Sequence, residues 1–184
     1  MTKPDLLIHT AFKLFYQHGI HAVGINLILQ ESGVAKKTLY HHFSSKETLL
    51  EAVLIYRDQV FMDWLISRMM AAGEGKNAVL GLFDALDDWF HDKVDVLLPF
   101  NGCFFAKANG EFSDHAVNEL CQRHKQNITS FIQANLIGCS SVLSSADLAQ
   151  SISVLKEGAI AQAYVAGDLD AAKRAKAMAV ALLG

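Results

Sequence analysis

Residues 26–50 read NLILQESGVAKKTLYHHFSSKETLL, and this stretch decides the fold of the N-terminal part of the chain. Two short segments, 26–32 and 36–43, have the length and composition of helices, and only Gly33-Val34-Ala35 separates them. Three residues allow little else than the tight turn of a helix-turn-helix. Glycine accepts the left-handed backbone that such a turn requires, and Val34 is placed to fill the gap between the two helices. The stretch therefore predicts a helix-turn-helix.

Two further helices are predicted to flank this motif. The apolar residues of 4–18 recur at i, i+4, i+7 and i+8, and Gly19 can end that helix. On the other side, Ser44 stands three residues before Glu47, which is the spacing of a capping box. The spacing predicts that a long helix follows and ends before the glycines of 73–75.

The rest of the chain is also predicted to be helical. The 184-residue chain is long enough to bury a core, 52% of it is hydrophobic, and it contains only two prolines, so its composition favours helices over β-structure. Apolar residues at helical spacing, together with Ser145 as an N-cap, predict helices over about 79–90, 103–109, 114–136, 145–165 and 169–183.

Charge is distributed unevenly along the chain. A net charge of −3 is unfavourable for binding nucleic acid, but this value averages over two parts of the chain that differ in charge. Residues 1–50 hold five lysines against three carboxylates, a net charge of +2, and five of the eight histidines. The other 134 residues hold 11 basic and 16 acidic groups, a net charge of −5. A basic head on an acidic body is typical of a DNA reader with a separate regulatory domain.

The segments FYQHGIHAVGIN (15–26), GVAKKTLYHHF (33–43) and SKETL (45–49) resemble the N-terminal domain of the tetracycline-repressor (TetR) family. The resemblance covers about residues 5–54 and is much more specific than a general helix-turn-helix pattern. It implies an all-α fold of about nine helices. It also implies a DNA-binding domain at 1–46 and a helical effector-binding and dimerisation domain at 47–184.

The second helix of the motif supplies the candidate DNA contacts. In a helix-turn-helix this helix enters the major groove, and its N-terminal residues meet base edges. Lysine can bond guanine or phosphate, threonine offers a hydroxyl and a methyl group, and Tyr40 and His42 can reach phosphates. Lys46 follows in the first turn of the next helix, whose free N–H groups favour a phosphate. The predicted contacts are Lys36, Lys37, Thr38, Tyr40, His41, His42 and Lys46.

Each of these predictions has an alternative. The three lysines can be ordinary solvated side chains, and His42 can fix the turn through a local hydrogen bond instead of touching DNA. Gly24 is a departure from the family, which often has serine or threonine just before the first helix of the motif, 26–32. Because glycine offers no side-chain oxygen, a phosphate contact is not expected at this position.

In this family the body binds a small molecule and pairs two subunits through its last two helices. Small residues in those helices, from Gly158 to Ala179, are compatible with close packing of a homodimer. Aromatic residues favour an apolar or aromatic effector, with His91, His115 and His124 as polar partners, although aromatics at helical spacing are more often core. The predicted effector pocket consists of Trp64, Phe83, Trp89, Phe90, Phe104, Phe105, Phe112 and His115.

No cofactor or metal is expected. The chain lacks His-x-x-x-His and Cys-x-x-Cys spacing, and its three cysteines, Cys103, Cys121 and Cys139, suit reduced thiols better than a disulfide framework. Cys103 follows an Asn-Gly turn and is a candidate sensor of oxidants or electrophiles. A buried structural thiol is the alternative.

The sequence thus predicts a transcriptional regulator, a repressor that a small-molecule effector releases from a pseudo-palindromic double-stranded operator. It shows no signal-peptide pattern and no run of about 18 apolar residues, so a soluble, cytoplasmic protein without a membrane partner is expected. Two alternatives remain, an enzyme and a helical ligand-binding protein, each with a vestigial DNA-binding head. The absence of a nucleophile elbow or phosphate loop speaks against an enzyme.

Overall fold

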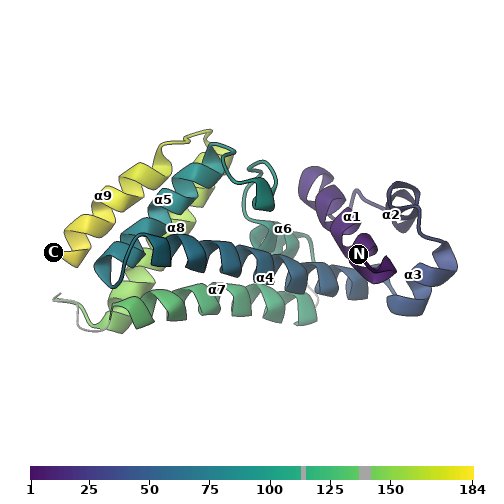
Figure 1. The fold of residues 1–184 in the computed structure, drawn as a ribbon, viewed down its shortest axis with the longest axis horizontal. Helices are drawn as coiled ribbons and strands as arrows, with labels where there is room; N and C mark the ends of the chain where they lie inside the picture. Colours follow the sequence, from purple (N-terminus) through teal and green to yellow (C-terminus); the bar gives the residue numbers. More distant parts are fainter. Residues whose placement is uncertain (113–114, 137–141) are drawn as a thin grey trace. The chain divides into compact units, whose positions relative to one another are not determined.

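The computed structural model describes residues 1–112, 115–136 and 142–184 (Figure 1). Within these ranges the chain is all-α, with no strand, as predicted. The expected helices 114–136 and 103–109 are present with slightly different bounds, whereas Asp114 and Cys139 lie outside the described residues. The elements are α1 (Lys3–His18), α2 (Ile25–Ser32), α3 (Lys36–His42), α4 (Lys46–Ala71), α5 (Lys76–Phe90), the 3-10 helix η1 (Asp95–Leu97), α6 (Phe104–Glu111), α7 (His115–Asn135), α8 (Ser145–Val165) and α9 (Ala171–Leu183).

The chain forms two compact units that do not follow the order of the sequence. Unit 1 comprises 1–59 together with 104–124, and unit 2 comprises 60–103 together with 125–184. Both α4 and α7 therefore begin in unit 1 and end in unit 2. A boundary between compact units need not coincide with a boundary between functional domains. The predicted boundary between the DNA-binding and effector-binding domains, at 46/47, therefore stays a prediction.

In unit 1, α2 and α3 pack on α1. Leu7, Ile28 and Leu39, one from each helix, are completely buried. Helix α1 begins with a full capping box, in which the Asp5 N–H donates to the Thr2 hydroxyl and the Thr2 N–H donates to the Asp5 carboxylate. Helix α1 thus supports α2 and α3, the two helices of the motif predicted from 26–50.

Two predicted helix caps are displaced by one residue. The capping box expected at Ser44 and Glu47 joins Ser45 and Thr48 instead, where each backbone N–H donates to the other side chain, at 3.0 and 3.3 Å. At the start of α8, the cap is Ser144 and not Ser145, because the Ser144 hydroxyl accepts from the Asp147 N–H at 3.1 Å.

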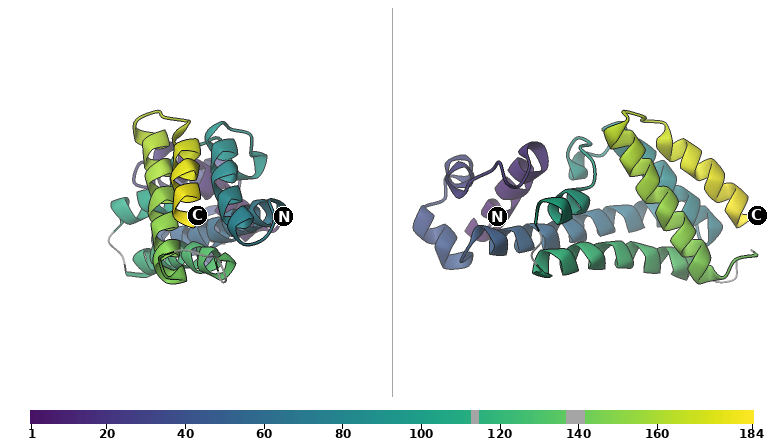
Figure 2. Two further views of the ribbon diagram at one scale, coloured as in Figure 1. Left: turned by 90° about the vertical axis from the view of Figure 1, so that its left-hand side faces the viewer. Right: turned by 180° about the vertical axis from the view of Figure 1, so that it is seen from behind.

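Unit 2 has one hydrophobic core. The C-terminal part of α4 and all of α5, α8 and α9 contribute to it, together with η1 and the C-terminal part of α7. Figures 1 and 2 show α9 beside α5 and α8, consistent with the contacts between these helices. Trp89 and Phe83 are almost completely buried in this core. None of the helices in the described ranges is long and apolar enough to cross a membrane.

Candidate DNA-binding site

The turn between α2 and α3 has the backbone that the sequence predicts. Gly33 ends α2 in the left-handed region at φ +66°, and its N–H donates to the Leu29 carbonyl at 3.0 Å. Val34 is 8% exposed, so it fills the space between the helices as expected. The helix-turn-helix is therefore formed, with α3 as its second helix.

Helix α3 separates buried from exposed residues sharply. Leu39 is fully buried and Phe43, directly after the helix, is 9% exposed, so both belong to the core. Thr38 is half-buried. The remaining predicted contacts on this helix are exposed, namely Lys36, Lys37, Tyr40, His41 and His42. One face of α3 thus carries cations, a phenol and imidazoles, which are groups that bind phosphates and base edges.

The exposed side chains of α3 contact one another. The Lys36 ammonium lies 5.9 Å from the centre of the Tyr40 ring, and the rings of His41 and His42 are 4.9 Å apart. In the described part of the chain, no ion pair neutralises Lys36 or Lys37. Their charge remains available to an anionic partner.

Lys46 is placed differently from the lysines of α3. It is half-buried, and its ammonium donates to the Ile20 carbonyl at 2.5 Å and lies 5.7 Å from the centre of the Phe15 ring. Burial lowers the pKa of Lys46, although the nearby carboxylates of Glu47 and Glu111 oppose that shift. The side chain thus connects the start of α4 to the segment after α1, and its contact with phosphate stays a prediction.

Glu111, at the end of α6, is a residue that sequence reasoning missed. Its carboxylate accepts the backbone N–H groups of Ile20 at 3.1 Å and His21 at 2.6 Å. The His21 ring in turn donates to the Glu111 carbonyl at 2.6 Å and stacks on Phe112 at 4.6 Å. The segment that leads from α1 to the helix-turn-helix is therefore held by α6, which lies about 90 residues later in the chain.

The residues of the predicted effector pocket fall in both units. Trp64, Phe83, Trp89 and Phe90 belong to unit 2, where Trp89 packs edge-on against Trp64 at 6.3 Å. Phe104, Phe105, Phe112 and His115 belong to unit 1. Ligand contact by any of them stays a prediction.

Most of these side chains already have partners in the fold. Phe104 packs edge-on against Phe12 at 5.4 Å, and Phe105 stacks at 3.6 Å on His124. His124 is 2% exposed and its Nδ1 lies 2.6 Å from Asp58 Oδ1. His115 is exposed and pairs with Glu119 at 3.5 Å.

One group of side chains in unit 2 has the composition of a metal site. Asp87, His91 and Asp170 place potential ligand atoms within 4.8 Å of one another. The spacing Asp-x-x-x-His at 87–91 is the signal that a search for paired histidines misses. However, the Lys173 ammonium lies 2.7 Å from Asp170 Oδ1 and 3.7 Å from Asp87 Oδ1. The Lys173 ammonium thus already pairs with both carboxylates, as a metal ion would. The expectation that no metal is bound stays a prediction.

Of the cysteines, Cys121 is buried, as expected for a structural thiol. Cys103 is half-buried, and its sulfur accepts a hydrogen bond from the Lys125 ammonium at 3.2 Å.

A second lysine, Lys156, is 2% exposed and pairs with Glu157. The sequence contains a signal for the burial of this lysine, because Lys156 stands four residues from both Ile152 and Ile160 on the apolar stripe of α8.

The comparisons with known proteins agree with this geometry. Residues 7–53 match the sequence model of the family described as "Bacterial regulatory proteins, tetR family". The N-terminal part of the chain is therefore similar in sequence to the DNA-binding domain of that family. The matched residues run from α1 through the helix-turn-helix into the first turns of α4.

Relatives by sequence share mainly this tetR domain. The chain is 39% identical over 67 residues to the HTH-type transcriptional repressor KstR2 of Mycolicibacterium smegmatis, which is 36% of this chain and 31% of KstR2. It is 36% identical over 80 residues to the HTH-type transcriptional regulator YxaF of Bacillus subtilis, which is 43% of this chain and 41% of YxaF. The aligned parts therefore span less than half of these relatives, which are named as transcriptional regulators.

Solved structures of the tetR family share the whole fold. A TetR-family transcriptional regulator from Streptomyces coelicolor superposes with a TM-score of 0.85 at 24% identity, covering 98% of this chain and 94% of that one. The reduced form of E. coli NemR superposes with a TM-score of 0.80 at 19% identity, covering 100% and 98% of the two chains. The fold of both units is thus that of tetR-family regulators.

Proposed function

We propose that the chain is a transcriptional regulator that binds a pseudo-palindromic operator as a homodimer and is released from it by a small-molecule effector. The observation that carries this proposal is the exposed face of α3, which presents Lys36, Lys37, Tyr40, His41 and His42 to solvent. A protein that acts in this way represses by occupying DNA. It needs no catalytic activity or cofactor, and it works in the cytoplasm, where bacterial operators lie.

A homodimer follows from the size of the recognition surface. One helix such as α3 reads too few base pairs to define an operator, and a two-fold dimer reads two half-sites about one helical turn, or a multiple of it, apart. The exposed residues of α8 and α9 supply a surface for the pairing. Val154 is 69% exposed, Val165 80% and Met178 57%, and such apolar exposure is typical of an interface.

The small residues of these two helices divide between two tasks. Ala159, Ala163, Ala172, Ala175 and Ala179 are buried, and they let α8 and α9 approach each other closely within one chain. Gly158, Ala161 and Ala166 are exposed and leave room for a second subunit. We therefore assign the pairing to the exposed stripe of α8 and α9.

The test is a selection of DNA fragments from the source genome by the purified protein, followed by sequencing. We expect a pseudo-palindrome to be enriched. Lys36→Ala/Lys37→Ala should weaken its binding and flatten the salt dependence of the logarithm of the binding constant by roughly 0.9 for each lost phosphate contact. The control is Lys3→Ala/Lys13→Ala, which removes the same charge from α1.

Each alternative function has its own outcome in this experiment. Failure to enrich any sequence at moderate salt, where phosphate contacts persist, would refute operator binding and favour a ligand-binding protein with a vestigial head. Equal losses in the two double variants would show that overall charge, and not α3, supplies the affinity.

A further inference from the structure

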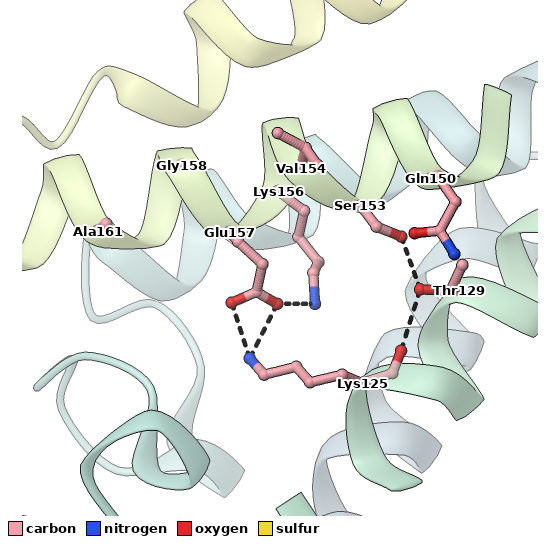
Figure 3. Close-up of a pocket in the computed structure, with 9 residues that line it drawn as sticks. All are labelled: Lys125, Thr129, Gln150, Ser153, Val154, Lys156, Glu157, Gly158 and Ala161. Carbon is pink, nitrogen blue, oxygen red and sulfur yellow. Dashed lines mark hydrogen bonds and ion pairs between the residues drawn. The ribbon is translucent and has the colours of Figure 1, made fainter. Parts of the chain in front are cut away.

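A pocket of about 630 Å³ lies between α7 and α8, entirely within unit 2 (Figure 3). One wall is apolar and is formed by Val154, Gly158 and Ala161 of α8, which are exposed in the single chain. They also lie on the surface assigned above to pairing, so a second subunit would cover this side of the pocket. The opposite part is polar. Figure 3 shows its charged and hydroxyl groups directed toward one another from the two helices, namely Lys125, Thr129, Ser153, Lys156 and Glu157.

Two ammonium groups in this pocket share one carboxylate. The Lys125 ammonium lies 2.8 and 2.7 Å from the two Glu157 oxygens, and the Lys156 ammonium lies 2.5 Å from Glu157 Oε1. Lys125 also donates to the Cys103 sulfur at 3.2 Å. Two ammonium groups and one carboxylate together carry a surplus of one positive charge.

Burial makes the charged form of Lys156 costly. Lys156 is 2% exposed, and burial lowers its pKa, as does repulsion from Lys125. Burial alone would raise the pKa of Glu157, but the ammonium groups of Lys156 and Lys125 outweigh burial and hold this pKa at about 2. The carboxylate is thus ionised at neutral pH and already engaged by both lysines. Of the three groups only Lys156 is shielded from water, because the side chains of Lys125 and Glu157 are 32% and 39% exposed. An anion beside the Lys156 ammonium would offset the cost of burying its charge.

The neighbouring groups suit the head group of such a counter-ion. The hydroxyls of Thr129 and Ser153 lie 2.8 Å apart at the edge of the pocket, and a hydroxyl can redirect its proton toward an arriving anion. The apolar wall next to them can cover a hydrocarbon body. The arrangement resembles the usual small-molecule site, which combines mainly apolar walls with a few convergent polar groups.

We propose that this pocket binds an amphipathic organic monoanion, a carboxylate on an apolar body, through Lys125 and Lys156, and that this ligand is the effector. The inference rests on the proposed function for its effector role, whereas the binding of the anion stands on the pocket alone. A neutral molecule of the same shape leaves the surplus charge unbalanced, and a cation adds to it. The pocket therefore selects by charge among ligands of equal size.

The test measures binding by calorimetry with three probes of equal chain length: octanoate, 1-octanol and octylamine. Octanoate should bind more tightly than 1-octanol by roughly tenfold to a hundredfold, the effect of a hydrogen bond to a charged group. Octylamine should not bind. Equal affinity for octanoate and 1-octanol, or no binding of octanoate, would overturn the proposal.

Two substitutions that should change the affinity for octanoate in opposite directions test whether the ligand binds in this pocket. Lys156→Met removes the buried charge but keeps an unbranched side chain, and it should weaken octanoate binding roughly tenfold or more without changing 1-octanol binding. Glu157→Gln raises the surplus charge and should strengthen octanoate binding. The control is Lys176→Met, which removes an ammonium that pairs with Asp84 outside the pocket. If Lys156→Met does not fold, Lys125→Met replaces it, because Lys125 is more exposed.

Binding and regulation are then separated with the operator recovered above. Octanoate should weaken operator binding by the wild-type chain and leave Lys156→Met unaffected, because linkage is reciprocal between the two sites. Octanoate binding that leaves operator affinity unchanged would overturn the effector assignment. Octanoate binding to a chain that selects no DNA would instead refute the proposed function and leave the anion site intact.

Discussion

Glu111 shows how much a single side chain contributes to the DNA-binding unit. Its carboxylate satisfies two consecutive backbone N–H groups, at Ile20 and His21, in the segment that follows α1. Gly19 directly before them has φ +88°, so the chain changes direction at this point. The Gly19 N–H still donates to the Phe15 carbonyl, whereas the next two N–H groups, of Ile20 and His21, donate to the Glu111 carboxylate.

We predict that Glu111→Ala lowers the free energy of unfolding by about 1–3 kcal/mol, because two charge-assisted hydrogen bonds are lost at a partly exposed site. Urea denaturation measures the change. Glu119→Ala is the control, since Glu119 pairs with the exposed His115 at the surface and its loss should cost at most about 0.5 kcal/mol. Equal effects of the two substitutions would contradict the structural role of Glu111.

At the scale of single helices, α2 has a glycine at each end, and the two glycines differ in backbone conformation. Gly24 is the N-cap, with φ −85°, no side-chain cap and no atom within 4 Å of an added Cβ. Gly33 is the C-cap, with φ +66° and equally open surroundings. Space is therefore available at both positions, and only the backbone conformation differs.

The same substitution should then have opposite effects. Gly24→Ser should raise the free energy of unfolding by about 0.5–1 kcal/mol, because serine caps α2 and restricts the unfolded chain. Gly33→Ser should lower it by about 1–2 kcal/mol, because serine in the left-handed region is strained. Thermal unfolding of the two variants measures these changes. Shifts of the melting temperature in the same direction would refute this account of α2.

The helix caps also show where sequence reasoning ends. Ser44-Ser45 and Ser144-Ser145 are both serine pairs, and the capping serine is the second in one pair and the first in the other. Periodicity placed the helices, but it could not choose between serines one residue apart, because the choice depends on the local backbone.

The candidate site divides in a similar way. The exposed face of α3 follows from local spacing, since Leu39 and Phe43 take the buried positions. The hydrogen bonds of Glu111 and the inward direction of Lys46 depend on packing between segments far apart in the chain. Nothing in a short motif encodes such contacts.

At the scale of the whole molecule, pairing of two chains is the feature most open to test. Met178→Glu places a charge on the apolar stripe of α9 at a side chain that is 57% exposed in the single chain. The fold should tolerate it, whereas an interface would have to bury the charge. We expect sedimentation equilibrium to give the single-chain mass of 20.2 kDa in place of twice that value, and operator affinity to fall.

Ile55→Glu is the matched control for this experiment, because Ile55 of α4 is 55% exposed. It should leave the mass unchanged. A wild-type chain that sediments with the mass of one chain, or a Met178→Glu variant that still pairs, would exclude the α8 and α9 surface as the interface.

The bonds from Glu111 to the segment after α1 have a consequence for protein engineering. A chimeric regulator made by grafting residues 1–46 onto a foreign body would leave α6 behind, and with it Phe104, which covers Phe12 and Tyr16. The transplanted head would then expose aromatic surface and lose the acceptor for two of its amides. A functional graft should carry 104–124 as well, so that the exchangeable module consists of two separate stretches of the gene.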